Sequence, residues 1–159
     1  TKFDGFRAIA DLGNGRCRLV SRKDHVYKSF QPLCDSIARF PVKSAILDRE
    51  IVRLDNLGRS VFDRLFYRQG TPYFYAFDLL WLNGRDLRNW PLLKRKARVK
   101  QIVLAGLKAL YSDHIEERGI ELFDLICQHD MEGVIEKWKF GRYDELGQDQ
   151  ESQVQPGCG

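Results

Sequence analysis

The residues best suited to chemistry stand near the beginning of the sequence, in the run Lys2-Phe3-Asp4-Gly5-Phe6-Arg7. If this run is extended, Lys2 and Asp4 point to one face, and a carboxylate lies beside a potential amine nucleophile. Gly5 permits a turn or the close approach of a ligand, and Arg7 offers a planar fork suited to phosphate or ribose oxygens. Solvated charges near a chain end are the simpler interpretation of the same run.

An amine nucleophile needs help from its surroundings. The ordinary pKa of lysine, about 10.4, lies roughly 3 units above neutrality, so deprotonation at neutral pH costs roughly 4 kcal/mol. Burial, positive neighbours or a metal ion can offset this cost. A functional Lys2 therefore requires basic groups or a metal close to it.

Other familiar site patterns are absent from the sequence. Gly13-Asn14-Gly15 lacks the third glycine of a dinucleotide fingerprint, and there is no G-K-[ST] phosphate loop, G-x-S-x-G elbow or H-E-x-x-H pair. The three histidines are isolated. The four cysteines form no C-x-x-C pair, so we expect reduced thiols in a cytosolic protein rather than disulfides or a zinc site.

The pattern K-x-D-G-x-R resembles the nucleophile motif of the nucleotidyltransferases that become covalently bonded to a nucleotide: DNA ligases, RNA ligases and mRNA capping enzymes. Segments similar to the family's other motifs follow in order, namely Ser21-Arg22, Ala45-Ile46-Leu47-Asp48-Arg49-Glu50-Ile51, Tyr75-Ala76-Phe77-Asp78-Leu79-Leu80 and Glu132-Gly133-Val134-Ile135-Glu136-Lys137. The stretch from Phe77 to Leu87 looks most like bacterial ATP-dependent DNA ligases, including the type associated with end joining.

The resemblance implies that Lys2, with Asp4 beside it, attacks the α-phosphate of ATP, releases pyrophosphate and becomes lysyl-AMP. AMP would then pass to a 5′-phosphate of nicked or broken double-stranded DNA, where the 3′-hydroxyl displaces it. The remaining implied roles are nucleotide contacts by Arg7, Arg22, Glu50, Phe77 (stacking on adenine) and Lys137, and Mg²⁺ contacts by Glu132 and Glu50. Phe77 could instead be a core residue, Glu132 a surface acid, and Lys137 a solvated lysine.

Three departures from the family pattern bear on activity. The sequence begins one residue before Lys2, Arg49 replaces the usual glycine between Asp48 and Glu50, and no W-x-K-x-K motif follows Phe140-Gly141-Arg142-Tyr143. The C-terminal oligonucleotide-binding domain of ligases, with its sixth motif, is absent too. We expect a ligase adenylation core, cut at both ends, that seals nicks poorly or not at all by itself. A catalytically silent nucleotide- or nucleic-acid-binding remnant and an RNA-ligase or capping-type enzyme remain alternatives.

The charge is distributed unevenly along the 159 residues. Residues 145–159 contain three acidic residues and no basic one, which leaves 26 basic and 19 acidic residues, a net charge of +7, in residues 1–144. A basic body suits a polyanionic partner. The helical run 94–100, Lys-Arg-Lys-Ala-Arg-Val-Lys, is either a DNA-backbone contact or a solvated helix face. We expect a core over residues 1–144 and a disordered, Gln-rich tail over residues 145–159.

The same composition, with 43% apolar and 30% charged residues, fits a globular domain. No apolar run reaches the length of about 18 residues that a membrane span needs. No apolar signal region begins the sequence either. We therefore expect no membrane partner and a cytoplasmic, nucleoid-associated protein.

Periodicity and turn signals predict the elements that must position these residues. We expect strands over residues 6–10 and 17–20, joined at Gly13-Asn14-Gly15, and further strands over 45–54, 73–82, 111–115 and 132–139. Helices are expected over 29–40, 60–68, 91–107 and 117–128. Because the strands come as hairpins rather than in regular strand–helix alternation, the pattern favours an α+β fold with an antiparallel sheet. The resemblance implies the corresponding ATP-grasp-like nucleotidyltransferase core of DNA ligase adenylation domains.

Overall fold

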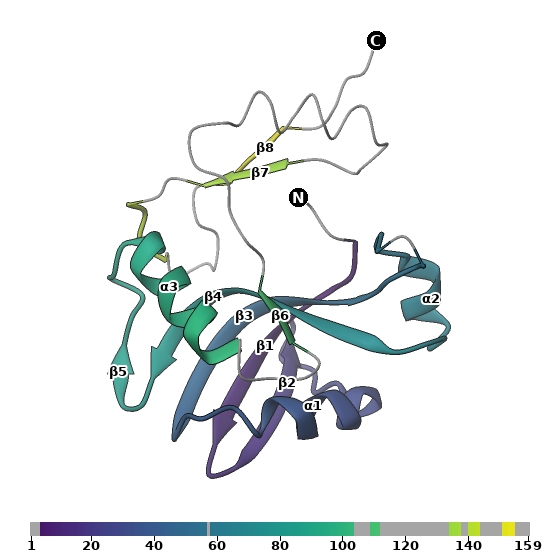
Figure 1. Cartoon of the computed structure of the whole chain (residues 1–159), viewed down its shortest axis with the longest axis horizontal. Helices are drawn as coiled ribbons and strands as arrows, with labels where there is room; N and C mark the ends of the chain where they lie inside the picture. The colour runs from purple at the N-terminus through teal and green to yellow at the C-terminus, as the bar shows by residue number, and fades with distance from the viewer. Residues whose placement is uncertain are drawn as a thin grey trace.

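The chain folds around one mixed sheet (Figure 1). The computed structural model describes residues 4–56, 58–103, 109–111, 134–137, 140–143 and 151–154, with side chains in residues 4–56, 58–103 and 140–143. Within these residues the sheet has the strand order β2-β1-β3-β4-β5, and β6 pairs in parallel with β4. Its strands are β1 (Phe6–Gly13), β2 (Arg16–Ser21), β3 (Ser44–Arg53), β4 (Pro72–Leu82), β5 (Arg85–Asp86) and β6 (Ala109–Tyr111). The neighbouring pairs along this order are antiparallel.

Two tight turns set the hairpins of this sheet. Asn14 and Gly15 have φ values of 52° and 69°, and Asn83 and Gly84 have φ values of 47° and 89°. Two successive left-handed residues match the right-handed twist of paired strands, which is why Asn-Gly is favoured there. The Asn83 side chain also accepts hydrogen bonds from the backbone of Lys43 (2.8 Å) and Ser44 (3.1 Å), which fixes the start of β3 against this turn.

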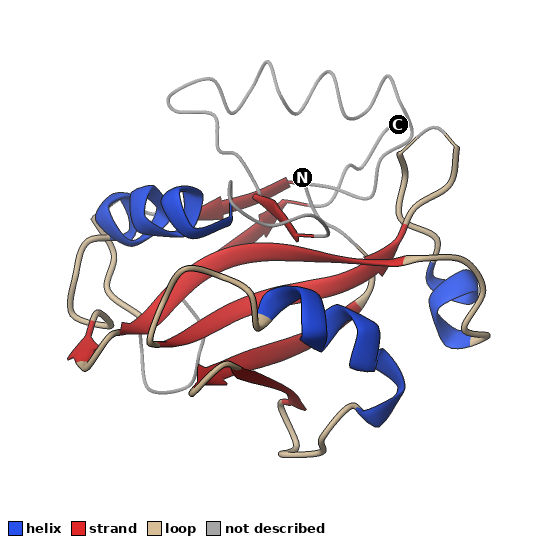
Figure 2. Ribbon diagram, turned by 60° about the horizontal axis from the view of Figure 1, so that its bottom comes forward, coloured by secondary structure: helices blue, strands red, loops and turns tan. Residues whose placement is uncertain are grey.

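The helices pack around the sheet at different places (Figure 2). The short 3₁₀ helix η1 (Lys28–Phe30) leads into α1 (Gln31–Ile37), which contacts β2 and β4. α2 (Phe62–Phe66) lies at the end of β3, and α3 (Leu92–Val103) packs on β4 and β6. Alternate residues of the three central strands are buried in one apolar core together with these helices, among them Ala8, Ala10, Leu47, Ile51, Phe74, Leu33, Ile37 and Val99.

The observed elements follow most of the expected ones. The helix expected over 29–40 is η1 followed by α1, because Pro32 stands in the first turn of an α-helix that begins only at Gln31. An extended segment was expected over residues 111–115. Of these, the structure describes Tyr111, which is the last residue of β6 (Ala109–Tyr111). The helix expected over 117–128 lies outside the described residues. β7 (Val134–Lys137) falls within the strand expected over 132–139.

The acidic tail contains a feature that the sequence analysis did not anticipate. Residues 151–154 form β8 (Glu151–Val154), which pairs antiparallel with β7, Val134 being opposite Val154. The division into a core and a tail stays a prediction, and within that tail residues 151–154 are extended. The cause is sequence-distant pairing with β7, which composition does not reveal. Among the described residues, no helix is long and apolar enough to cross a membrane.

Candidate functional site

Strand register brings three sequence-distant segments to one face of the sheet. Arg7 of β1 is the register partner of Glu50 of β3, and Glu50 is the partner of Tyr75 of β4. Cross-strand partners share a face, so these three side chains form a row. Asp48 and Asp78, also register partners, lie one step along on the same face. The residues between them belong to the core on the other face. We call the face carrying Arg7, Asp48, Glu50 and Tyr75 the site face.

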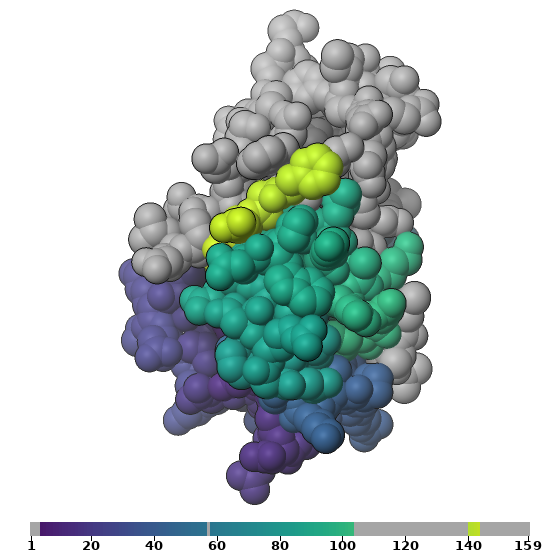
Figure 3. All heavy atoms as spheres, turned by 90° about the vertical axis from the view of Figure 1, so that its left-hand side faces the viewer, coloured from purple at the N-terminus to yellow at the C-terminus, as the bar shows by residue number. Residues whose placement is uncertain are grey.

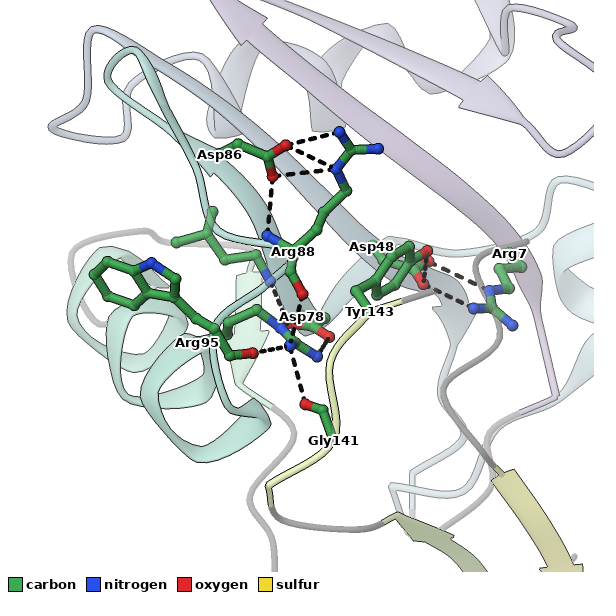
Figure 4. Close-up of polar contacts among 10 residues, drawn as sticks. Arg7, Asp48, Asp78, Asp86, Arg88, Arg95, Gly141 and Tyr143 are labelled. Atoms are coloured by element: carbon green, nitrogen blue, oxygen red, sulfur yellow. Dashed lines mark hydrogen bonds and ion pairs between the residues drawn. The ribbon is translucent and has the colours of Figure 1, made fainter. Parts of the chain in front are cut away.

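Arg7 and Asp48 form the strongest polar contact on the site face (Figure 4). Arg7 Nη2 donates to Asp48 Oδ2 at 2.7 Å, and Arg7 Nε donates to Oδ1 at 3.3 Å. The Asp48 side chain is only 4% exposed, while Arg7 is 23% exposed. The hydroxyl of Tyr143 donates to the same Oδ2 at 3.1 Å. A charge-assisted, two-point contact of this kind fixes the guanidinium plane, so Asp48 positions Arg7 at the edge of the site.

Glu50 lies beside this pair in an unusual electrostatic setting. Burial raises the pKa of Glu50 to about 7; Arg7 and Arg22 oppose this rise, and the carboxylates of Asp48 and Asp4 add to it. The Glu50 carboxylate is thus near half protonation at neutral pH and surrounded by both signs of charge. A cation brought to this carboxylate would favour its ionised form.

The chemistry of Glu50 fits Mg²⁺, which binds through one or two carboxylates together with substrate phosphates and water. Within the residues whose side chains are described, no group of three or more His, Cys, Asp or Glu side chains gathers to hold a metal by itself. Glu132, the other expected metal residue, lies outside the described residues.

The run that contains Lys2 approaches the sheet beside Glu50. The backbone N–H of Asp4 donates to Ser60 Oγ at 3.1 Å. A Cβ added to Gly5 would collide with the carbonyl oxygen of Ile51 and would lie 2.9 Å from Cγ of Glu50. Gly5 is therefore required for the close approach of this segment to β3, and the approach of a ligand to Gly5 stays a prediction. β1 begins only at Phe6, so strand alternation does not fix the direction of Asp4, and Lys2 lies outside the described residues.

Phe77 stands at an irregularity of β4. Asp48 pairs with Asp78 and Arg49 pairs with Ala76, which leaves Phe77 between them without a register partner. Such bulges re-aim side chains and are frequent beside active sites. Phe77 is half-buried and is not among the buried core residues. The simple interpretation of Phe77 as a core residue therefore does not hold, although its stacking on adenine stays a prediction.

The other residues expected at the site are distributed as follows. Arg22 is exposed just after β2, and its charge reaches Glu50. Lys137 is the last residue of β7, and only its backbone is described. Arg49 is fully buried, with its guanidinium 4.5 Å from the centre of the Phe74 ring. Strand alternation accounts for this burial, because it turns Arg49 toward the core face, opposite its neighbours Asp48 and Glu50.

The basic run of residues 94–100 is not one solvated face, because Arg95 is completely buried. Arg95 donates to both carboxylate oxygens of Asp78, each at 2.8 Å, with side-chain exposures of 0% and 1%. Its Nη1 also donates to the carbonyl oxygens of Trp90 and, at 3.2 Å, Gly141. Lys94, Arg98 and Lys100 of this run are exposed. For these residues, contact with the DNA backbone and simple solvation both remain possible interpretations.

Arg95 thereby anchors the segment Phe140–Tyr143 against α3 and the loop before it. The Gly141 carbonyl accepts a second hydrogen bond, from the Leu92 backbone, and the Tyr143 N–H donates to the Arg88 carbonyl at 2.9 Å. Figure 3 shows this segment, in yellow-green, lying along the teal surface of that region. The anchored segment places the Tyr143 hydroxyl on Asp48, so a buried ion pair and the site face are connected (Figure 4).

Sequence reasoning missed two residues of the site face and one of its contacts. Tyr75 stands two residues before Phe77, and strand alternation could have indicated that these two side chains share a face. Asp48 was part of a recognised motif but received no role. Tyr143 lies 95 residues from its partner Asp48, and no local pattern signals a contact over that distance.

Comparisons with known proteins agree with this arrangement. A protein-family model described as "ATP dependent DNA ligase domain" matches residues 1–150. The multifunctional non-homologous end joining protein LigD of Mycolicibacterium smegmatis is 30% identical over 144 residues, which are 86% of this chain and 18% of that protein. The LigD protein of Pseudomonas aeruginosa is 31% identical over 145 residues, 86% of this chain and 17% of that protein.

Solved structures give the same result for the fold. The crystal structure of the ligase domain from M. tuberculosis LigD superposes with a TM-score of 0.75 at 28% identity, covering 90% of this chain and 48% of that one. A mycobacterial DNA ligase D complexed with ATP and MES gives a TM-score of 0.76 at 28% identity with the same coverage. The chain thus spans under a fifth of these two LigD proteins and about half of these two solved structures. The expected antiparallel α+β nucleotidyltransferase fold is confirmed, and the chain belongs to the ATP-dependent DNA ligase family.

Proposed function

We propose that this chain is the adenylation core of a DNA ligase and that Lys2 is its nucleophile. The observation that carries the proposal is the register of β1, β3 and β4, which aligns Arg7, Glu50 and Tyr75 on one face. These residues come from three separate motifs of the ligase pattern. The contacts of Asp4 with Ser60 and of Gly5 with Ile51 and Glu50, close in sequence to Lys2, support its assignment to the same site.

In the proposed reaction the Lys2 amine attacks the α-phosphorus of ATP. A nitrogen–phosphorus bond forms, the bond between the α-phosphorus and its bridging oxygen breaks, and pyrophosphate leaves with that electron pair. The amine gives its proton to solvent or to a neighbouring base. Arg7 and Arg22 supply positive charge for the phosphate oxygens, which favours both the transition state and the neutral amine.

The remaining site residues have different roles in the proposed binding of ATP. Glu50 contacts a ribose hydroxyl or takes part in holding Mg²⁺ together with Glu132, and the metal would supply charge neutralisation at the phosphates. Phe77, at its bulge, and Tyr75 offer aromatic faces for the adenine. Lys137 is assigned to the nucleotide phosphates. Asp48 and Tyr143 hold Arg7 in place rather than touching the nucleotide.

The substrate that accepts AMP in this proposal is the 5′-phosphate at a nick or break in double-stranded DNA. The names of the LigD relatives, which refer to end joining, support this assignment. The positive charge of residues 1–144 suits a polyanion. The intact ligase would include an oligonucleotide-binding domain after this core and would act on DNA in the cytoplasm, at the nucleoid.

The test is covalent labelling of the 159-residue chain. The protein is incubated with α-labelled ATP and Mg²⁺, denatured, and examined for label that stays on the polypeptide. We expect label in the wild type and in Lys23→Ala, an exposed lysine on the turn after β2, and none in Lys2→Ala. Addition of pyrophosphate should remove the label, because the first step is reversible.

Two outcomes would reject the proposal. Absence of label in the wild type would leave a nucleotide- or nucleic-acid-binding remnant, and label that persists in Lys2→Ala would place the nucleophile elsewhere. A parallel reaction with α-labelled GTP tests the capping-type alternative, which requires GTP to label the chain at least as well as ATP. Transfer of AMP to a nicked duplex and to nicked RNA then separates DNA ligation from RNA ligation.

A further inference from the structure

A basic pocket lies at the end of the sheet where β3 meets α2, apart from the site face. It has a volume of about 210 Å³ and is lined by Arg53, Leu54, Arg64, Gln69, Gly70 and Thr71. We call it the α2 pocket. Its lining contains two guanidinium groups, an amide and a hydroxyl, and it contains no carboxylate. The ligase reaction described above uses none of these residues.

The floor of the α2 pocket is an arginine that lacks hydrogen-bond acceptors. Arg53 is only 6% exposed, yet its Nε and Nη1 have no hydrogen-bond partner. Both nitrogens are shielded from water as well, so solvent does not replace the missing acceptors. Burial correspondingly lowers the pKa of Arg53. A buried polar group without a partner costs free energy, and in native proteins it often marks a place for an ion.

The loop after α2 lies beside the Arg53 guanidinium. A Cβ added to Gly70 would lie 3.9 Å from Arg53 Nη1, and both residues line the pocket. Arg68 and Gly70 both have left-handed backbone conformations, with φ values of 58° and 76°. The rim residues Arg64, Gln69 and Thr71 are exposed. Donors from the rim and the floor can therefore converge on one small ligand.

We propose that the α2 pocket binds a phosphate group, between the guanidinium of Arg53 below and Arg64, Gln69 and Thr71 at the rim. Phosphate offers several acceptor oxygens in a compact dianion, which matches a site with planar donors and no acid. The phosphate group belongs either to a free phosphate ion or to the backbone of DNA. Both sources present the same oxygens to the pocket.

This site is separate from the nucleotide site. Arg53 follows Glu50 by three residues on β3, a distance of roughly 10 Å along a strand. Alternation places Arg53 on the face of Arg49 and Ile51, opposite the face of Glu50, and its register partner is Pro72, whereas Glu50 pairs with Tyr75. Binding at the α2 pocket can thus be measured whether or not Lys2 forms an adduct.

The first experiment locates phosphate binding by ¹H–¹⁵N NMR of the full 159-residue chain. Inorganic phosphate is titrated at constant ionic strength against chloride, and the Nε–H signal of Arg53 and the amides of Gly70 and Thr71 are followed. We expect saturable shifts with phosphate and none with chloride. In Arg64→Gln the dissociation constant should rise about tenfold, as expected for one lost charge-assisted contact.

Arg39→Gln is the matched control, because Arg39 is an exposed arginine after α1, away from the pocket. Its dissociation constant for phosphate should stay within twofold of the wild type. Arg53→Met, which keeps the length of the side chain, should abolish the saturable shifts at Gly70 and Thr71. Should Arg53→Met not fold, Arg64→Gln decides the matter, since its side chain is exposed.

The second experiment distinguishes the two sources of phosphate. Binding of a fluorescent nicked duplex is measured by anisotropy over a range of salt concentrations. If the pocket takes a DNA phosphate, Arg64→Gln should weaken binding and reduce the slope of log K against log salt by about one, while Arg39→Gln leaves both unchanged. An unchanged DNA affinity together with the NMR shifts identifies free phosphate as the ligand. Absence of saturable shifts at the pocket together with equal DNA binding by wild type and Arg64→Gln would overturn the proposal.

Discussion

The buried ion pair between Arg95 and Asp78 gives the most direct test of how the site is held in place. Arg95→Met keeps most of the aliphatic volume and removes the guanidinium. Asp78, whose side chain is 1% exposed, would then lose both charge-assisted hydrogen bonds from Arg95 and keep the one from the Leu79 N–H, at 2.8 Å. The carbonyl of Gly141 would lose one of its two donors.

The loss of stability expected in Arg95→Met follows from the burial of the ion pair rather than from the distance between its atoms. Removing one partner of a buried pair leaves an uncompensated charge and costs about 3–5 kcal/mol. Domains of this size have total stabilities of about 5–15 kcal/mol, so Arg95→Met should unfold at a much lower urea concentration than the wild type. The pair Arg88–Asp86 supplies the control, because it has an equally short contact of 2.7 Å but exposures of 53% and 36%. Arg88→Met should therefore cost less than about 1 kcal/mol.

Urea denaturation of the wild type, Arg95→Met, Asp78→Leu and the double variant measures the coupling between the two residues. We expect each single variant to lose several kcal/mol and the double variant to recover a large part, since no unpaired charge remains buried. An Arg95→Met variant no less stable than Arg88→Met would refute the reasoning. So would strictly additive costs in the double variant, because additivity would mean that the two groups do not depend on each other.

Three further predictions concern the sheet and its site face. The pKa of Glu50 in the folded state is about 7, above its unfolded value of 4.5, so the stability due to its bound proton is present below pH 4.5 and is lost as pH rises through 7. Glu50→Gln should therefore flatten the dependence of the unfolding free energy on pH between these values. An unchanged pH dependence would contradict the raised pKa. Gly5→Ala should destabilise the chain and abolish labelling of Lys2, because the new methyl group meets the Ile51 carbonyl; normal labelling would show that the contact is dispensable. Arg49→Met should leave the melting temperature unchanged or raise it, since Nε and Nη2 of Arg49 are buried without partners, and a large fall would show that the contact with Phe74 outweighs the burial cost.

Local sequence signals predicted the parts of this fold that local physics decides. Asn14-Gly15 and Asn83-Gly84 have the backbone conformations that hairpin turns require, and the turns form where these residues stand. Strands were expected over residues 6–10 and 45–54, and Arg7 and Glu50 lie on these strands; that they are register partners is seen only in the structure. The family resemblance added the expectation that residues of these strands contribute to one site, without indicating how the strands pair.

The features that sequence reasoning missed depend on contacts between distant segments. In the sequence, nothing distinguishes Arg95 from the other basic residues of its helix. Its role depends on Asp78 of β4, with which it pairs in the structure. The bulge at Phe77 arises from the pairing of β3 with β4, and β8 arises from pairing with β7. None of these is encoded in a window of neighbouring residues, so composition and periodicity could not reveal them.

Three buried arginines of this chain differ in how far the fold supplies their partners, and the difference separates structural roles from binding roles. Arg95 has a carboxylate and carbonyl acceptors, so its donors are occupied and it holds Phe140–Tyr143 in place. Arg49 is enclosed by the core, with one hydrogen bond to the Leu47 carbonyl and the ring of Phe74. No ligand can reach it there, which makes it a cost to stability. Arg53 lacks acceptors as Arg49 does, but it borders a pocket that opens between other donors. Among the residues whose side chains are described, Arg49 and Arg53 have buried nitrogens without partners. Of these two, Arg53 is the one that can gain its missing acceptor from outside the chain, and this is the physical reason for assigning a phosphate to it.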